Sequence, residues 1–178
     1  VVNSRTSAEA VLAKNPDGSI CTIDFGEFDC GFVDFTSEAG RQWYKDRIIR
    51  RSMLDLGVSG WMADFGEYLP TDVRVASGED GWKVHNQWPA RWARVNAEAI
   101  AEAGLADEIL FFMRAGYTGS QKYCKLMWAG DQLVDFSRHD GLETAICAAL
   151  SWFLIEQPAL VWKRRLVARV TAPADTSR

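Results

Sequence analysis

The alternation of strand-like and helix-like segments is the feature that most restricts what this chain can fold into. Short segments rich in β-branched and aromatic residues are separated by longer segments whose apolar residues recur at helical spacing. A strand followed by a helix and another strand indicates parallel pairing with a right-handed crossover. In chain order we expect a strand at 19–25, a helix at 36–57, a strand at 58–64, a helix at 87–104, strands at 108–114 and 125–131, and a helix at 138–150.

The residues that flank the two longer helices support these boundaries. Thr36 or Ser37 can cap the first helix, and Gly57 stops it. The second helix tolerates Pro89 near its expected start and ends at Gly104. Neither a GxGxxG nor a GxxxxGK[ST] motif follows an expected strand, which disfavours a nucleotide-binding doubly wound sheet. The pattern therefore favours an α/β fold of the (β/α) barrel type.

Composition excludes several classes of partner. The chain has 178 residues and is 48% hydrophobic, enough for the core of one domain. Its net charge of −4 provides no basic field for nucleic acid. Eight tryptophans suit either core packing or stacking on sugar rings. No apolar run approaches the ~20 residues of a membrane helix, and no charged-then-apolar leader opens the chain. We expect a cytoplasmic protein that binds neither nucleic acid nor membrane.

The cysteines and histidines form no metal-binding or disulfide pattern. The four cysteines contain no CxxC pair and do not cluster with either histidine in the sequence. We therefore predict no metal, no cofactor and no disulfide framework. His139 lies among charged residues of an expected helix and is most simply solvated.

Three charged residues stand at the ends of expected strands. Asp64 ends VSGWMAD, Arg114 ends EILFFMR, and Asp131 ends KLMWAGD. In a parallel barrel the carboxyl ends of neighbouring strands meet at one mouth, where catalytic groups collect. Two carboxylates facing one bond are the equipment of glycoside hydrolysis. Asp64, ionised beside Arg114, would be the nucleophile, and Asp131, in a drier pocket, would be the acid.

Other readings of the same residues remain open. Paired carboxylates also bind metals, Asp64 or Glu67 could cap a helix or pair with a structural arginine, and Arg114 could form a salt bridge at the barrel rim. His85 could be a polar residue at a helix start instead of a ligand. Trp61 and Trp128, close before the two acids, could line either the core or a sugar site.

Four longer stretches carry a family resemblance. GWMADFGEYLPTD, HNQWPARW, FFMRAGYTGSQKY and WAGDQLVDFSRHDGL resemble, in order and spacing, the catalytic core of bacterial sulfoquinovosidases in glycoside hydrolase family thirty-one. The wider family, which includes α-glucosidases and α-xylosidases, has its nucleophile in W-x-D-x-N-E and its acid/base in W-x-G-D. WMADFGE has one residue inserted before the aspartate and Gly66 where asparagine is usual, and ADFGE is the form expected in the sulfoquinovosidase branch.

The resemblance implies a fold, an activity and residue roles. It implies a partial (β/α)8 TIM barrel, with about four β/α units of a larger catalytic domain, and a retaining α-glycosidase that needs no cofactor. Asp64 would be the nucleophile, Asp131 the acid/base and Arg114 a contact to the sugar, with Trp61, Trp128, Glu67 and His85 as further substrate-binding candidates. The implied substrate is sulfoquinovosyl glycerol, cleaved inside the cell. An α-glucoside or α-xyloside substrate, or a non-catalytic truncated remnant, are the alternatives.

The resemblance covers only part of the expected domain. It runs from about Asp24 to Ser151, so we expect a lead-in at 1–18, the central part of the barrel at 19–151, and a divergent tail at 152–178. The tail is basic and lacks glycine, as a shifted reading frame or chimeric gene would produce. The segments that read the sulfonate in the family are not found, so we expect a piece of a longer protein. Four strands would leave open edges, and we expect the isolated chain to aggregate.

Overall fold

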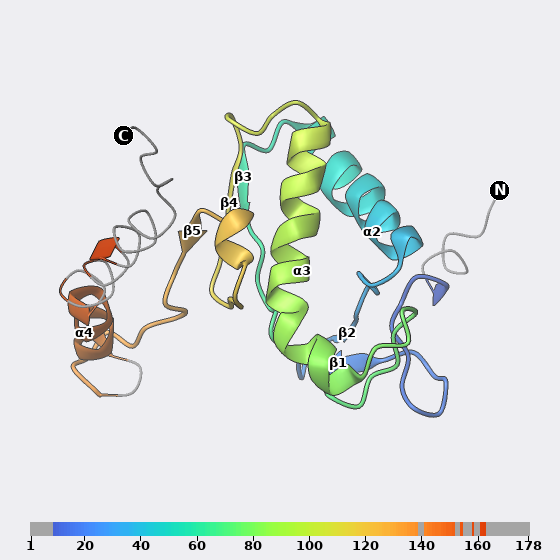
Figure 1. The fold of residues 1–178 in the computed structure, drawn as a ribbon, viewed down its shortest axis with the longest axis horizontal. Coiled ribbons are helices and arrows are strands. Elements are labelled where there is room, and N and C mark those ends of the chain that lie inside the picture. Colours follow the sequence, from blue (N-terminus) through green and yellow to red (C-terminus); the bar gives the residue numbers. More distant parts are fainter. Residues whose placement is uncertain (1–8, 139–140, 152–153, 155–157, 159–160, 163–178) are drawn as a thin grey trace, which may run out of the picture. The chain divides into compact units, whose positions relative to one another are not determined.

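A computed structural model describes residues 9–138, 141–151, 154, 158 and 161–162 of the chain (Figure 1). The chain divides into two compact units, Val1–Trp128 and Ala129–Arg178, and each is described by itself. The first unit holds all five strands and most of the described helical residues. The second unit contains the helix α4, Leu142–Ser151, close to the expected helix at 138–150. His139 and most of the expected tail lie outside the described residues.

The first expected strand does not belong to the parallel sheet. β1, Thr22–Asp24, pairs antiparallel with β2, Asp29–Gly31, and forms a two-stranded hairpin. Gly26 turns the chain with a φ of 87°, and the N–H of Phe25 donates to the Phe28 carbonyl at 3.0 Å. The expectation of parallel pairing for this strand is wrong, because this tight turn returns the chain before any helix can form.

The first long helix forms where it is expected, but it is not regular throughout. α2, Glu38–Tyr44, is capped by the Ser37 hydroxyl, which accepts from the Gly40 N–H at 2.9 Å. It continues as a π-helical segment, η1, Lys45–Arg50. A short 3₁₀ turn, η2, Leu54–Leu56, follows and ends at Gly57, whose φ of 77° lies in the left-handed region. The predicted cap and stop residues are confirmed.

A parallel sheet forms the centre of the first unit. Its strands are β3, Gly60–Met62, β4, Leu110–Met113, and β5, Leu126–Met127, in the order β3-β4-β5. Trp61 lies opposite Phe111, and Phe112 lies opposite Leu126. The predicted partial (β/α) barrel is confirmed, with three parallel strands and no closed barrel among the described residues.

The crossover helix between β3 and β4 is longer than expected. α3, Gly81–Glu102, begins at Gly81 and not at Gln87, because the Asp80 side chain accepts from the Trp82 N–H at 3.1 Å and caps the helix there. Pro89 is therefore inside the helix. Figure 1 shows the helix axis changing direction in its N-terminal part, as a proline inside a helix produces.

Buried side chains form two clusters, one on each flank of α3. One cluster joins α3 to the N-terminal segments and is built around the aromatic pair Phe35 and Trp88. The other joins α3 to the helix-facing side of the sheet. Its buried members are Ala63, Ala93, Ile100, Phe111, Met113 and Cys124. The sheet and the turn that follows β3 are thereby fixed to α3.

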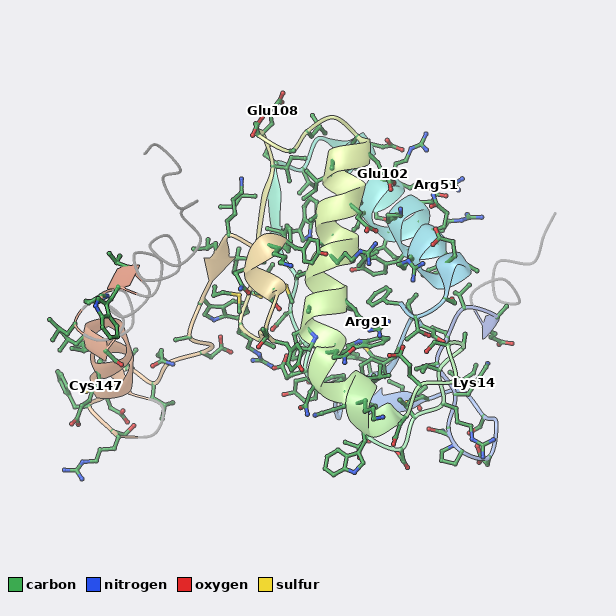
Figure 2. All side chains as sticks on the ribbon, viewed as in Figure 1. Lys14, Arg51, Arg91, Glu102, Glu108 and Cys147 are labelled. Carbon is green, nitrogen blue, oxygen red and sulfur yellow. The ribbon has the colours of Figure 1, made fainter. Side chains whose placement is uncertain are left out.

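The π-helical segment η1 adds a charged contact to α3. Lys45 is buried, and its Nζ lies 2.5 Å from an oxygen of Glu102, the residue labelled near the end of α3 in Figure 2. The connection from β4 to β5 has a single 3₁₀ turn, η3, Ser120–Lys122, in place of a long helix. No helix in the described part of the chain is long and apolar enough to cross a membrane.

Candidate active site

The alternation of side chains in the sheet separates helix-facing residues from those on the opposite face. Ala63 and Met113 are buried against α3. Met62 and Leu110 alternate with these residues along the strands, so their side chains lie on the opposite face of the sheet, where they are exposed. In a closed barrel this face would line the interior. Asp64 and Arg114 follow the ends of β3 and β4. Their side chains meet at the carboxyl edge of the sheet, as predicted for a barrel mouth.

Arg114 lies between two carboxylates. Its Nε is 2.7 Å from Oε1 of Glu67 and 3.2 Å from Oδ1 of Asp64. The three side chains are between 19% and 36% exposed, so the contacts are only partly screened by water. Burial lowers the pKa of Arg114, but the hydrogen bond to Glu67 and the charges of Glu67 and Asp64 outweigh it and leave the pKa raised. The guanidinium therefore remains a permanent cation here.

The two contacts of Arg114 differ in kind. The Nε of arginine carries one hydrogen, and it is donated to Glu67. Asp64 therefore forms an ion pair with Arg114, but its Oδ1 accepts no hydrogen bond among the described residues. A carboxylate that is paired with a cation but accepts no hydrogen bond from it is suited to act as a nucleophile.

Two aromatic rings cover the guanidinium of Arg114. Its central carbon lies 5.0 Å from the ring centroid of Phe65 and 5.8 Å from that of Tyr68. The Tyr68 hydroxyl also lies 3.4 Å from Nη2. Asp64, Phe65, Glu67 and Tyr68 belong to one turn, so this turn wraps around Arg114 and fixes its position.

The hairpin supplies a second layer of aromatic contacts. Phe25 lies 5.1 Å from Phe65 and 5.5 Å from Tyr68, and Phe28 stacks on Phe25 at 5.6 Å. Sequence reasoning missed these residues. A signal was available, because DFGEF at 24–28 and DFGEY at 64–68 are nearly the same five letters, and their aromatic residues meet.

The backbone of the turn after β3 is strained. Phe65 has a φ of 61°, and it is the one described residue other than glycine with a positive φ. At Gly66 an added Cβ would lie 3.3 Å from the Met113 side chain and 3.6 Å from Trp92. A larger residue at this position would require the Met113 side chain to shift by a few tenths of an ångström, so glycine lets the turn lie close to the core.

The structure does not bring Trp61 and His85 to this group of residues. The Trp61 indole N–H donates to Oδ1 of the buried Asn96 at 2.8 Å, and its ring packs in the helix-facing cluster. His85 lies on α3, and its Nδ1 is 2.5 Å from the Leu69 carbonyl oxygen. Both side chains contribute to packing in the first unit, so the core interpretation of Trp61 fits its position.

Trp128 and Asp131 lie at and beyond the end of β5. The Trp128 N–H donates to the Met113 carbonyl at 3.0 Å, and its ring meets Phe112 edge-on at 5.3 Å. Phe112 and Trp128 lie on the same face of the sheet as Arg114, because side chains two residues apart along a strand share a face and Phe112 pairs with Leu126. This tryptophan is therefore on the face that carries the charged group. Asp131 is an exposed residue of the second unit.

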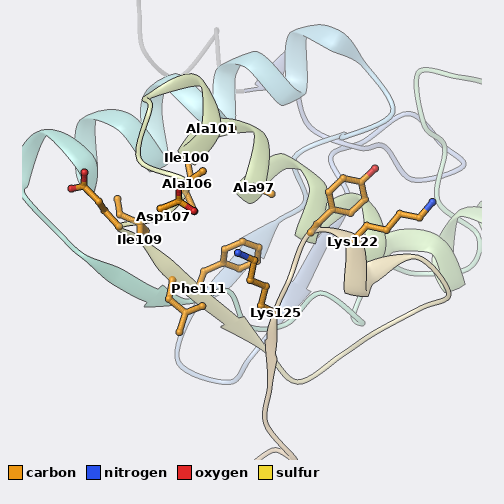
Figure 3. Close-up of a pocket in the computed structure, with 12 residues that line it drawn as sticks. Ala97, Ile100, Ala101, Ala106, Asp107, Ile109, Phe111, Lys122 and Lys125 are labelled. Atoms are coloured by element: carbon orange, nitrogen blue, oxygen red, sulfur yellow. The ribbon is translucent and has the colours of Figure 1, made fainter. Parts of the chain in front are cut away.

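One cavity of the first unit is lined by none of Asp64, Glu67 and Arg114. The cavity in Figure 3, of about 390 Å³, lies between the C-terminal half of α3, the start of β4 and the region of η3. None of the predicted site residues lines it. Within the described residues, no group of three or more His, Cys, Asp or Glu side chains could hold a metal ion.

Comparison with known proteins agrees with this architecture. Residues 2–159 match the TIM-barrel domain of glycosyl hydrolases family 31. The chain is 58% identical over 140 residues to a sulfoquinovosidase of Agrobacterium fabrum, which covers 79% of this chain and 21% of that protein. It is 54% identical to a sulfoquinovosidase of Escherichia coli, with 20% of that protein covered. The chain thus spans about a fifth of the length of these curated relatives.

Solved structures show the same relationship. A family 31 sulfoquinovosidase from E. rectale, in complex with an aza-sugar inhibitor, matches with a TM-score of 0.77 and 51% identity over 83% of this chain and 22% of that one. A cycloalternan-degrading enzyme from Trueperella pyogenes matches with a TM-score of 0.64 and 30% identity over 75% of this chain and 18 to 19% of that one. The chain belongs to glycosyl hydrolase family 31, as part of its TIM-barrel domain.

Proposed function

We propose that the protein containing this chain is a retaining α-glycosidase that hydrolyses α-sulfoquinovosides. The observation that carries the proposal is the ion pair between Asp64 and Arg114 at the carboxyl ends of two adjacent parallel strands. Membership of family 31 and similarity to two sulfoquinovosidases support the same activity. In this proposal 19–151 forms the central part of the catalytic barrel, and 152–178 is a separate tail.

The reaction takes place in two displacements. In the first, a carboxylate oxygen of Asp64 attacks the anomeric carbon, the bond to the leaving oxygen breaks, and the Asp131 carboxyl protonates that oxygen. In the second, water attacks the anomeric carbon, the Asp131 carboxylate takes the proton of the water, and the ester to Asp64 breaks. The released sugar keeps its anomeric configuration, and both aspartates return to their starting protonation states.

Arg114 serves this reaction in two ways. Its Nε lies 3.2 Å from the Asp64 carboxylate, so its positive charge holds and orients the group that attacks. Its remaining N–H groups provide donors for sugar hydroxyls in the subsite where the bond breaks. Trp128, on the same face of the sheet, supplies an aromatic surface for a sugar ring. The chemistry requires no metal or cofactor, and we place the protein in the cytoplasm.

An α-xyloside or α-glucoside is the second candidate substrate. The observation that favours it is a 34% identity over 105 residues to the α-xylosidase XylQ of Lactiplantibacillus pentosus. The relatives named sulfoquinovosidase are more similar over a longer stretch, which favours the sulfonated sugar.

The test is a rate comparison on the complete gene product that contains this chain. The 4-nitrophenyl α-glycosides of sulfoquinovose, glucose and xylose are compared for the wild type, Asp64→Asn and Asp131→Asn. We expect the sulfoquinovoside to be cleaved fastest, and Asp64→Asn to lose at least about a thousandfold in kcat/KM. Asp131→Asn should lower mainly kcat, because 4-nitrophenolate departs with little help from an acid whereas the attack of water still needs the base. Unchanged turnover in both variants would end the proposal, and a preference for xylose or glucose would replace the substrate.

A further inference from the structure

We propose that Glu67 is a positioning residue that acts through Arg114. By accepting the one Nε hydrogen of Arg114, Glu67 allows this cation to neutralise Asp64 without a hydrogen bond to the attacking carboxylate. The inference rests on the proposed function, because it concerns how the nucleophile is prepared.

The first step of the argument is the allocation of that hydrogen. Arg114 Nε lies within 3.2 Å of both carboxylates, yet it can make only one strong hydrogen bond. Glu67 is the nearer partner at 2.7 Å, and it satisfies the geometry of a hydrogen bond. Asp64 Oδ1 is buried and accepts none among the described residues. Glu67 and Asp64 therefore compete for the same donor, and Glu67 has it.

The second step is the effect of that allocation on Asp64. A hydrogen bond from a guanidinium to a carboxylate is short and strong, and it withdraws electron density from the carboxylate. Without Glu67, the Nε hydrogen would be free to turn to Asp64. The carboxylate would then be better stabilised before the reaction than in the transition state, where its charge disappears, and the first displacement would slow.

The third step concerns the surroundings of Arg114. Its guanidinium lies over the rings of Phe65 and Tyr68, and these contacts oppose its movement toward solvent when Glu67 is removed. Asp64 and Glu67 share the Nε of Arg114, and the Tyr68 hydroxyl lies near its Nη2. When Glu67 is removed, we therefore expect the Nε hydrogen of Arg114 to be donated to Asp64.

A double-mutant cycle on the complete gene product separates this role from direct sugar binding. Glu67→Ala removes the acceptor, Glu67→Gln keeps an uncharged acceptor, and Arg114→Met removes the donor at similar length. Glu79→Ala is the matched control, because it breaks another glutamate–arginine pair, with Arg91 on α3, at 2.8 Å. Arg91 is labelled in Figure 2. Cleavage of an activated 4-nitrophenyl glycoside and thermal unfolding are measured for each variant.

We expect Glu67→Ala to lower kcat/KM, which reports the first displacement, about 10- to 100-fold, the range expected for a charge-assisted hydrogen bond, and Glu67→Gln to recover within about fivefold of the wild type. In the Arg114→Met background, Glu67→Ala should change kcat/KM by less than about twofold, because its partner is absent. Glu79→Ala should leave kcat/KM unchanged.

Three outcomes would overturn the inference. They are an equal loss from Glu67→Ala in both backgrounds, no rescue by Glu67→Gln, and a loss of unfolding temperature that accounts for the lost rate. Each differs from failure of the proposed function, which would appear as full activity in Asp64→Asn.

Discussion

Asp64 illustrates how much a single strand-end residue can indicate and where that indication stops. An acid directly after an apolar strand, with no basic residue near it in sequence, predicts a functional role, and the structure supplies its partner, Arg114, from the next strand. The competition between Asp64 and Glu67 for one hydrogen depends on distances of a few tenths of an ångström. Residue spacing does not contain this information.

Phe65 stores backbone strain beside the nucleophile candidate, and two substitutions test this. Phe65→Gly and Phe65→Ala both remove the ring from Arg114 and Phe25, but only glycine adopts a φ of 61° without a steric cost. We expect the glycine variant to be more stable than the alanine variant by about 1 kcal/mol. Thermal unfolding of the complete gene product measures the order. An alanine variant of equal or higher unfolding temperature would show that the turn is not held at a positive φ.

The hairpin β1–β2 is the element that carries the second aromatic layer, and Phe25 is its contact to the turn after β3. Phe25→Ala removes the ring that contacts both Phe65 and Tyr68. Because the turn carries Asp64, a small displacement should lower kcat/KM about 10- to 100-fold. Steady-state kinetics measure it. Phe28→Ala is the matched control, since among the described residues the Phe28 ring stacks on Phe25 and on no ring of the turn after β3. A comparable loss there would contradict the proposed support.

The packing of α2 on α3 predicts a stability change at high pH. Burial raises the pKa of Tyr44 to about 12, and its ring lies 5.5 Å from that of Trp92. The unfolded phenol ionises near pH 10, so between about pH 10 and 12 the unfolded state loses its proton first and stability falls as pH rises. Below pH 10 this contribution is constant.

Tyr44→Phe tests this directly. The unfolding temperature of the wild type should fall more steeply than that of Tyr44→Phe between about pH 10 and 12, and the two slopes should agree below pH 10. Lysines lose their protons in the same way in both proteins. The difference between the two slopes of unfolding temperature against pH therefore reports Tyr44. Parallel curves through the whole range would show that the phenol does not ionise later in the folded protein.

The elements that the sequence predicts well are those with local signals. Ser37 and Gly57 mark the ends of the first helix, and the apolar runs locate all three parallel strands. The early start of α3 was missed because proline at position 89 was placed in the first turn, whereas the Asp80 cap starts the helix earlier. The hairpin was missed because its partner strand, Asp29–Gly31, has only three residues and no periodicity.

At the scale of the first unit, the sheet presents an exposed apolar face. Met62, Leu110 and Leu126 share one side of the sheet and are 50%, 47% and 45% exposed. β3 and β5 each have an open edge among the described residues. Exposed apolar faces and open strand edges promote association between copies.

We therefore expect the 178-residue chain, produced alone, to aggregate at micromolar concentration. Lysine at Met62, Leu110 and Leu126 should reduce light scattering, because it places charge on the apolar face. Three lysines at exposed polar positions, including Ser52, give the same net charge and should not. A wild-type chain that remains monomeric in size-exclusion chromatography would contradict the prediction.

The central claim is that Asp64 forms a covalent bond to the sugar, and trapping that bond tests it most directly. The complete gene product is incubated with a fluorinated α-sulfoquinovosyl donor, which slows the second displacement, and digested for mass spectrometry. We predict that the peptide containing Asp64 gains the mass of one sugar, and that Asp64→Asn gains none. Turnover of the donor with no sugar on Asp64, or with the sugar on another residue, would contradict the account.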